Sequence, residues 1–125
     1  MTQQTTSGAR GLSRVRVAIP ARFGDVLALT ADLTERGCGL YVAGPVAVGE
    51  AYDLALEPVG EERVECRVQV RWMRAEERLN RVGCRIVHTS RSRAAVRRLM
   101  TLVWAQRVKS AGTFADALLY RTAAR

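Results

Sequence analysis

The sequence predicts a mainly β domain in which six antiparallel strands form a small barrel or sandwich and a C-terminal α-helix packs on it. Three observations support this prediction. Short apolar runs recur at roughly even spacing and are separated by residues typical of turns. Apolar and polar residues alternate strictly over residues 63–72. After residue 90 the apolar period changes to that of an α-helix.

The expected strands follow one another without helices between them. The first ends at Pro20, which restricts it to an edge, a bulge or the end of a strand. The fifth is the clearest, because its apolar residues share one parity and should face the core: Val64, Cys66, Val68, Val70 and Trp72. In the sixth, Gly83 indicates a bend or a close backbone approach. The six expected strands are residues 15–19, 26–31, 38–42, 51–56, 63–75 and 82–87.

Two helices are expected after the strands. Ser90 can cap a helix that begins at Arg91, and an apolar stripe on this helix should face the core: Val96, Leu99, Met100 and Val103. Lys109–Gly112 combine a cation with a glycine, which is typical of a helix end. A second, short helix over Phe114–Thr122 should then either dock on the barrel or mediate a homodimer.

Length and composition indicate one folded domain with a tail at each end. A chain of 125 residues with 48% hydrophobic and 26% charged residues can bury a core without disulfides or metals. Residues 1–9 are polar and are expected to be a disordered tail. The domain is expected over residues 10–108, and residues 109–125 are expected to form a C-terminal helical tail.

The charge of the chain indicates a polyanionic partner. The formal net charge is +8, and Lys109 is the only lysine, so the excess is carried by arginines, which suit phosphate and nucleobase partners. A nucleic acid is disfavoured, because 6% aromatic residues leave little for the base-stacking surface that single-strand binders use. The alternative for most of the arginines is that their number reflects the base composition of the genome and that they lie on a solvated surface.

The cysteines and the single histidine argue against a metal centre. The sequence contains no C-x-x-C, and its only candidate ligands of this kind are Cys38, Cys66, Cys84 and His88. The cysteines are expected to be small core residues, which fits a reducing, cytoplasmic setting. No apolar run is long enough to span a membrane, and the N-terminus lacks a signal-peptide core.

Nothing in the sequence indicates catalysis. His88 has no acid or nucleophile that can be paired with it from the sequence, and neither G-x-S-x-G nor a P-loop is present. No pair of carboxylates has a spacing that marks a general acid and base. The chain is therefore expected to be a binding protein rather than an enzyme, and no cofactor is expected.

Two polar motifs are the candidate binding residues. Asp32-Leu33-Thr34-Glu35-Arg36-Gly37 should form a tight turn, with Asp32 and Thr34 bonding backbone amides and Gly37 providing φ > 0 where the chain reverses. Arg10 and Arg14 precede the first strand on a segment that can fold back over the barrel. Arginines bind the O6 and N7 edge of guanine and phosphates, while a carboxylate accepts from guanine N1–H and N2–H₂. An anionic guanine compound would match this set.

These residues resemble the signatures of the PilZ domain family. Arg10-Gly11-Leu12-Ser13-Arg14, followed by Val-x-Val and a proline, is similar to the R-x-x-x-R opening of that family. Asp32–Gly37 is similar to its [DN]-x-S-x-x-G motif, with threonine for serine. Residues 44–50 resemble the loop before the fourth strand of the family, and residues 81–86 resemble its sixth strand. The resemblance extends over residues 10–108.

The resemblance implies a six-stranded barrel that binds the bacterial second messenger cyclic di-GMP and signals to a downstream protein by a conformational change. By the same resemblance, Arg10 and Arg14 would grip guanine and phosphate, and Asp32, Thr34 and Gly37 would form the barrel side of the site. Two positions depart from the family pattern: Thr34 adds a methyl group, and Ala9 stands where another arginine can precede the pair. The alternative is an adaptor of the same fold that binds proteins and has lost nucleotide binding.

Overall fold

The chain forms a closed barrel of six antiparallel strands, as expected, and the barrel is followed by one long helix. The computed structural model describes residues 14–123 and the side chains of residues 14–107. Around the barrel the strand order is β1-β2-β3-β6-β5-β4, and every neighbouring pair is antiparallel. The elements are β1 (Pro20–Phe23), β2 (Val26–Leu33), β3 (Gly37–Val42), β4 (Ala51–Leu56), β5 (Val64–Glu76), β6 (Leu79–Val87) and α2 (Ser90–Ala123).

The core fills the barrel with side chains from all six strands and from α2. Alternation along each strand sends every second side chain inward, which is why the strand pattern could be read from the sequence. The largest completely buried apolar side chains are Phe23, Leu33, Leu40, Val42, Leu54, Leu56, Val68, Val70, Val82, Val96 and Met100. Burial of side chains of this size stabilises the fold by about 1.5–3 kcal/mol each.

The prediction of a first strand at residues 15–19 is wrong. Within this segment only Val15 forms a β-bridge, to Leu33, and β1 begins at Pro20 instead. The buried hydroxyl of Thr30 replaces a regular ladder here, because it accepts a hydrogen bond from the Ile19 amide at 2.8 Å and donates one to the Val17 carbonyl. The alternation in residues 15–19 reflects the burial of Val15 and Ile19.

The helix α2 differs from the prediction in its cap and its length. Thr89, not Ser90, caps it: the Thr89 hydroxyl accepts from the Ser92 amide at 3.1 Å, and the Ser92 hydroxyl accepts from the Thr89 amide at 2.9 Å. The helix also continues through Gly112 to Ala123, so the expected break and separate second helix are wrong. A single glycine costs a helix only about 1 kcal/mol, and no proline follows to stop it.

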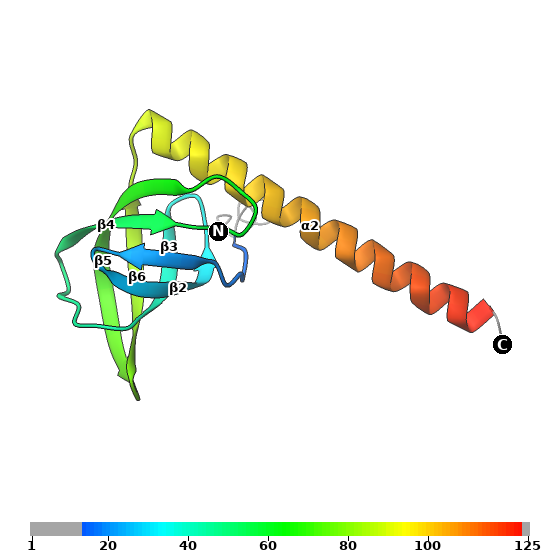
Figure 1. Ribbon diagram of the computed structural model, residues 1–125, viewed down its shortest axis with the longest axis horizontal. Coiled ribbons are helices and arrows are strands. Elements are labelled where there is room, and N and C mark those ends of the chain that lie inside the picture. The colour runs from blue at the N-terminus through cyan, green and yellow to red at the C-terminus, as the bar shows by residue number, and fades with distance from the viewer. Residues whose placement is uncertain (1–13, 124–125) are drawn as a thin grey trace, which may run out of the picture.

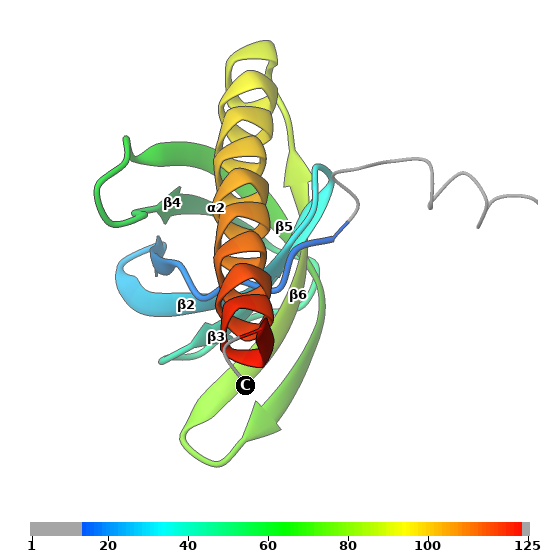
Figure 2. The same ribbon diagram turned by 90° about the vertical axis from the view of Figure 1, so that its right-hand side faces the viewer.

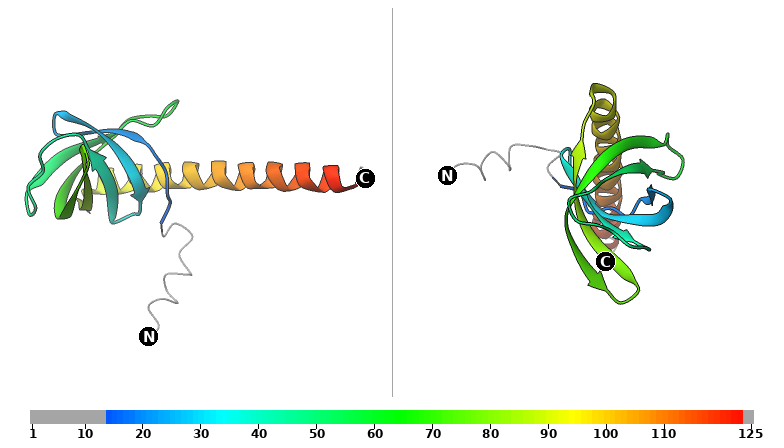
Figure 3. Two further views of the ribbon diagram at one scale, coloured as in Figure 1. Left: turned by 90° about the horizontal axis from the view of Figure 1, so that it is seen from below. Right: turned by 90° about the vertical axis from the view of Figure 1, so that its left-hand side faces the viewer.

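The first part of α2 packs on the barrel, and the rest extends away from it (Figures 1 and 3). The predicted stripe is confirmed, since Val96, Leu99 and Met100 are buried and Val103 is half-buried. With the C-terminal end of α2 toward the viewer, the barrel lies behind the helix (Figure 2). Within the described part of the chain, no helix is both long and apolar enough to cross a membrane.

Candidate functional site

The β2–β3 turn consists of Thr34, Glu35 and Arg36, and it is closed by hydrogen bonds between Thr34 and Gly37. The Thr34 amide donates to the Gly37 carbonyl at 2.8 Å. The Thr34 hydroxyl accepts from the amides of Arg36 at 3.1 Å and Gly37 at 2.9 Å, and it donates to the Gly37 carbonyl at 3.2 Å. Because a hydroxyl has one donor and two acceptor sites, the Thr34 side chain is fully engaged within its own turn.

Gly37 is required for a different reason from the one expected. It does not have a positive φ, whereas Gly24, Gly49 and Gly60 do. A Cβ atom at residue 37 would instead overlap the backbone carbonyl of Cys84 on β6. The glycine therefore permits the close approach of β3 and β6 immediately after the turn.

Asp32 belongs to strand β2 rather than to the turn. The register between β2 and β3 shifts between Thr30 and Asp32, so that Asp32 faces Gly39. The Gly39 amide donates a hydrogen bond to Asp32 Oδ1 at 2.8 Å. The Asp32 side chain is only 19% exposed, and this irregularity in the ladder holds it on the outer surface of the barrel.

Arg14 lies beside Asp32 because the residue that follows it is paired to β2. The Val15 amide donates to the Leu33 carbonyl, and the Leu33 amide donates to the Val15 carbonyl, both at 2.9 Å. Arg14 Nη1 lies 4.0 Å from Asp32 Oδ2, and the Arg14 side chain is 66% exposed. Arg10 lies outside the described residues, as does the expected tail over residues 1–9.

Arg81 on β6 is a site residue that the sequence reasoning missed. Its Nη2 atom lies 3.9 Å from Asp32 Oδ2, and its side chain is only 16% exposed. The guanidinium carbon also lies 5.1 Å from the ring centroid of Tyr41 and 5.6 Å from that of Trp72. A Cβ atom at Gly39 would lie 2.6 Å from Arg81 Nη1, so the bare glycine provides the room in which the guanidinium lies.

Trp72 faces outward, contrary to the parity expected for β5. The register between β5 and β6 shifts between Val70 and Trp72, and this bulge moves the following side chains to the opposite face. The Trp72 side chain is 46% exposed and covers Gly83, where a Cβ atom would overlap the indole. The sequence predicted a bend or a close backbone approach at Gly83, but the group that approaches this glycine is the Trp72 side chain and not another backbone. In the sequence, Arg81 has the parity of Gly83, opposite to the apolar residues of this strand. That parity predicts an outward side chain, and it was the signal that could have identified Arg81 as a site residue.

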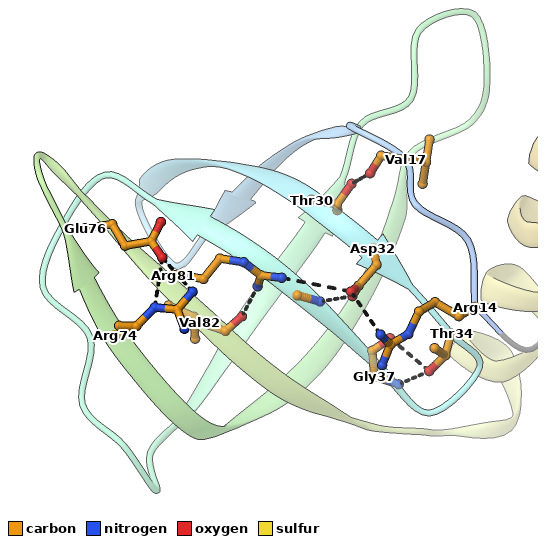
Figure 4. A network of polar contacts seen from close by, with 11 residues as sticks. Arg14, Val17, Thr30, Asp32, Thr34, Gly37, Arg74, Glu76, Arg81 and Val82 are labelled. Atoms are coloured by element: carbon orange, nitrogen blue, oxygen red, sulfur yellow. Dashed lines mark hydrogen bonds and ion pairs between the residues drawn. The ribbon is translucent and has the colours of Figure 1, made fainter.

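These residues line one open cavity of about 300 Å³ on the outer face of the barrel. Of the predicted site residues, the structure brings together Arg14, Asp32, Thr34 and Gly37. Figure 4 shows the carboxylate of Asp32 between the guanidinium groups of Arg14 and Arg81. Strands β5 and β6 add five further lining residues: Arg71, Trp72, Arg81, Gly83 and Cys84. An anionic ligand with a flat aromatic ring would find arginines, a hydrogen-bond acceptor and an indole face here.

A larger cavity, of about 470 Å³, lies between β1, β4, β5 and the start of α2. Several of its charged side chains are already paired with one another: Arg67 with Asp53 at 2.8 Å, and Arg63 with Glu65 at 3.2 Å. It contains none of the motif residues. The smaller cavity is therefore the better candidate site.

The thiols of Cys38 and Cys66 do not supply nucleophiles, whereas the hydrogen bond with Cys38 lowers the pKa of the Cys84 thiol. Cys38 and Cys84 are buried cross-strand partners, and the hydrogen bond with Cys84, together with burial, raises the pKa of the Cys38 thiol. Burial likewise raises the pKa of Cys66 to about 11. The thiols of Cys38 and Cys66 therefore stay protonated at neutral pH and act as small core groups. Among residues 14–107, whose side chains the structure describes, no cluster of three or more cysteine, histidine or acidic side chains could hold a metal ion.

Three solved structures share the fold of this chain. The Bacillus subtilis inhibitor of motility (MotI/DgrA) matches with a TM-score of 0.63 and 12% identity, over 78% of this chain and 52% of that chain. YcgR from Escherichia coli, in complex with c-di-GMP, matches with a TM-score of 0.69 and 11% identity, over 84% of this chain and 50% of that chain. The PilZ domain of CeSA from a cellulose-synthesizing bacterium matches with a TM-score of 0.54 and 16% identity, over 72% of this chain and 96% of that chain.

The first two of these structures are longer than this chain, which spans about half of each. A comparison with curated protein sequences gives no significant match. The family model that describes the PilZ domain matches residues 6–102, which include both arginines of the first motif and the whole of the second. With the six-stranded barrel, the single helix and this match, the chain belongs to the PilZ domain family.

Proposed function

We propose that this protein is a cyclic di-GMP receptor that binds the dinucleotide over Asp32 and signals through a conformational change. The observation that carries the proposal is the place of Asp32: its carboxylate lies between Arg14 and Arg81 at 4.0 and 3.9 Å, next to the exposed face of Trp72. The c-di-GMP complex of YcgR, which shares the fold, supports this choice of ligand.

The contacts of Asp32 leave one carboxylate oxygen available to a base. Oδ1 accepts from the Gly39 amide, whereas Oδ2 lies at 3.9–4.0 Å from the two guanidinium groups, beyond hydrogen-bond distance. Oδ2 can therefore accept from guanine N1–H or N2–H₂. The guanidinium groups of Arg14 and Arg81 can bond the O6 and N7 edge or the phosphates, and the base can stack on Trp72.

The other motif residues have supporting roles in this proposal. Thr34 holds the turn in shape with its hydroxyl, and Gly37 allows β3 to approach β6. Arg10, four residues before Arg14, would also contact the bound ligand. The protein would act by binding rather than by catalysis, in the cytoplasm, and would pass the signal to a downstream protein.

Isothermal titration calorimetry with cyclic di-GMP tests the proposal. The wild type should release heat on binding, and Arg14→Ala and Asp32→Ala should each weaken or abolish it. Arg22→Ala is the matched control, because Arg22 is an exposed arginine on β1 and does not line the site. The absence of any binding heat with the wild type would overturn the proposal, as would an equal loss in the Arg22→Ala control.

A second function is favoured by the engagement of Thr34 and by the projection of α2. The Thr34 hydroxyl has no capacity left for a ligand, and α2 extends away from the barrel (Figure 3). Both features suit a protein-interaction adaptor that does not bind nucleotide. Partners captured by the wild type that are still captured when Arg10 and Arg14 are both alanine would support the adaptor over the receptor.

The tail over residues 109–125 is the proposed route to a homodimer. It is the continuation of α2, which reaches Ala123. Light scattering of the full chain and of a chain that ends at residue 108 distinguishes the two states. A dimer that becomes a monomer on truncation supports this role, and an oligomeric state that truncation does not change excludes it.

A further inference from the structure

We propose that His88 is a positioning residue that links the ligand turn to the start of α2, so that the state of the turn is transmitted to the helix. This inference rests on the proposed function for the identity of the ligand, although the link itself does not depend on any ligand. His88 and Thr89 are the two residues between the end of β6 and the start of α2. The link is therefore made at the point where the barrel passes into the helix.

The imidazole of His88 contacts the turn with one nitrogen and the helix with the other. Nε2 bonds the backbone carbonyl of Glu35, the middle residue of the β2–β3 turn. Nδ1 lies 3.3 Å from the hydroxyl of Ser92 in the first turn of α2. Since a carbonyl can only accept, the proton lies on Nε2 and Nδ1 is an acceptor. The single proton of the Ser92 hydroxyl lies within reach of both Nδ1 and the Thr89 carbonyl, which is 3.2 Å away. Because the ring is rigid, a displacement of the Glu35 carbonyl also displaces the Ser92 side chain.

The turn has two other contacts, one with α2 and one with β6. Arg97 of α2 places Nε 3.3 Å from the Glu35 carboxylate, and the Ile86 amide of β6 donates to the Arg36 carbonyl at 2.7 Å. The Arg97 side chain is 58% exposed, and exposed ion pairs contribute only about 0–1 kcal/mol. His88 is half-buried and Ser92 is buried, so the imidazole is the stronger connection to the helix.

Both ends of the link are stiff, and the helix it reaches is long. On one side, Thr34 ties the turn together with three hydrogen bonds of its hydroxyl. On the other, Ser92 is part of the capping box with Thr89. The 34 residues of α2 span about 50 Å at 1.5 Å per residue. A small tilt at Ser92 is therefore enlarged at the far end of the helix, which extends beyond the barrel (Figure 1).

A ligand-free experiment tests the link by hydrogen exchange. Thr34→Val loosens the turn without touching α2 directly, and it should raise amide exchange over residues 92–96 by about threefold or more. In a His88→Phe background, which keeps an aromatic ring but removes both hydrogen bonds, Thr34→Val should leave exchange over these residues unchanged. His88→Gln, which retains a donor toward Glu35, should restore part of the effect. Exchange over β4 is the internal control and should not respond.

Equal responses of residues 92–96 in the two backgrounds, or none in the wild-type background, would overturn the link. If His88→Phe does not fold, His88→Ala, which also removes both hydrogen bonds, takes its place, and a response as large as that in the wild-type background then counts against the link.

A second arm adds cyclic di-GMP at saturation, set from the calorimetric Kd of each variant. Protection over residues 92–96 should increase in the wild type and not in the His88→Phe variant. A protein with the ligand-free response but no binding heat retains the link and contradicts the proposed function. Binding without protection of residues 92–96 contradicts the inference that the ligand uses the link.

Discussion

The indole of Trp72 lies on the backbone of Gly83, in the space that any side chain at residue 83 would occupy. The contact joins neighbouring strands β5 and β6 on the outer face of the barrel, directly after the bulge in β5. Arg81 lies against the same indole and reaches Asp32. A flat aromatic surface therefore adjoins the carboxylate at the candidate site only because residue 83 has no side chain.

Gly83→Ala should displace the indole while the barrel remains folded. The new Cβ atom would overlap the indole, which is exposed enough to swing away, so the cost in stability should be under about 1 kcal/mol. Loss of the stacking surface should weaken cyclic di-GMP binding by about tenfold or more, as measured by calorimetry.

Trp72→Ala provides the control for this prediction. It should weaken binding by a similar factor, and adding Gly83→Ala to it should cause no further loss. Unchanged affinity in Gly83→Ala, with a tryptophan fluorescence shift that shows the indole has moved, would remove Trp72 from the site.

Asp32→Asn and Asp32→Ala should separate the structural and electrostatic roles of this carboxylate. Asparagine keeps an acceptor for the Gly39 amide, whereas alanine leaves that amide without its partner. Alanine should therefore lower the free energy of unfolding by about 1–3 kcal/mol in urea denaturation, and asparagine by clearly less. Both should impair ligand binding, since both remove the charge between Arg14 and Arg81. Equal destabilisation would show that the Gly39 hydrogen bond contributes nothing.

Thr34→Ser should leave the turn intact, and Thr34→Val should loosen it. Serine keeps the hydroxyl that serves the amides of Arg36 and Gly37, and valine keeps the shape without the hydroxyl. We expect valine to cost about 1 kcal/mol or more of stability and serine to cost less. If calorimetry with Thr34→Ser shows tighter ligand binding than the wild type, the methyl group of Thr34 crowds the ligand.

Gly112→Pro should divide α2 without affecting the barrel. The glycine lies within the continuous helix, where proline removes a backbone donor and clashes with the preceding turn, at a cost of about 3 kcal/mol. Circular dichroism should show a loss of helical signal, and Gly112→Ala should show a gain. The thermal midpoint of the barrel should not change. A helical signal that proline leaves unaltered would restore the separate second helix that the sequence suggested.

The stability of the fold should decrease as the pH rises from about 9 to about 11. Burial raises the pKa of Cys66 from 9.0 to about 11, so the unfolded chain loses this thiol proton first. The unfolded state then binds fewer protons than the folded state, and the free energy of unfolding falls with pH in this window. Urea denaturation of wild type and Cys66→Ala at pH 8 and pH 10.5 measures the effect. The variant should lose less stability over that interval than the wild type, and an equal loss would assign the decrease to other groups.

Much of the barrel could be predicted from local pattern. In β5 and β6, apolar and polar residues alternate because one face of each strand is buried, and the buried positions Val68, Val70, Val82 and Ile86 follow directly. The switch of period after residue 90 identified α2 and its buried stripe for the same reason. The two polar motifs were visible because arginine, aspartate and glycine stand out between apolar runs.

Other features were not visible, because they depend on contacts between distant segments. The bulge that turns Trp72 outward shows only in the pairing of β5 with β6. The start of β1 at Pro20 depends on the hydroxyl of Thr30, which bonds the segment that the alternation had marked as a strand. His88, read as an isolated histidine, contacts Glu35 across 53 positions of sequence.

By itself, the sequence determined the fold class, the family signatures and four of the residues that line the site, because periodicity and residue chemistry are local properties. The tertiary structure alone decided that Arg81 and Trp72 join Asp32, that Gly37 and Gly83 serve close approach, and that the turn is tied to α2. These outcomes follow from strand register and from the room left by missing side chains, and both are set only when the barrel closes.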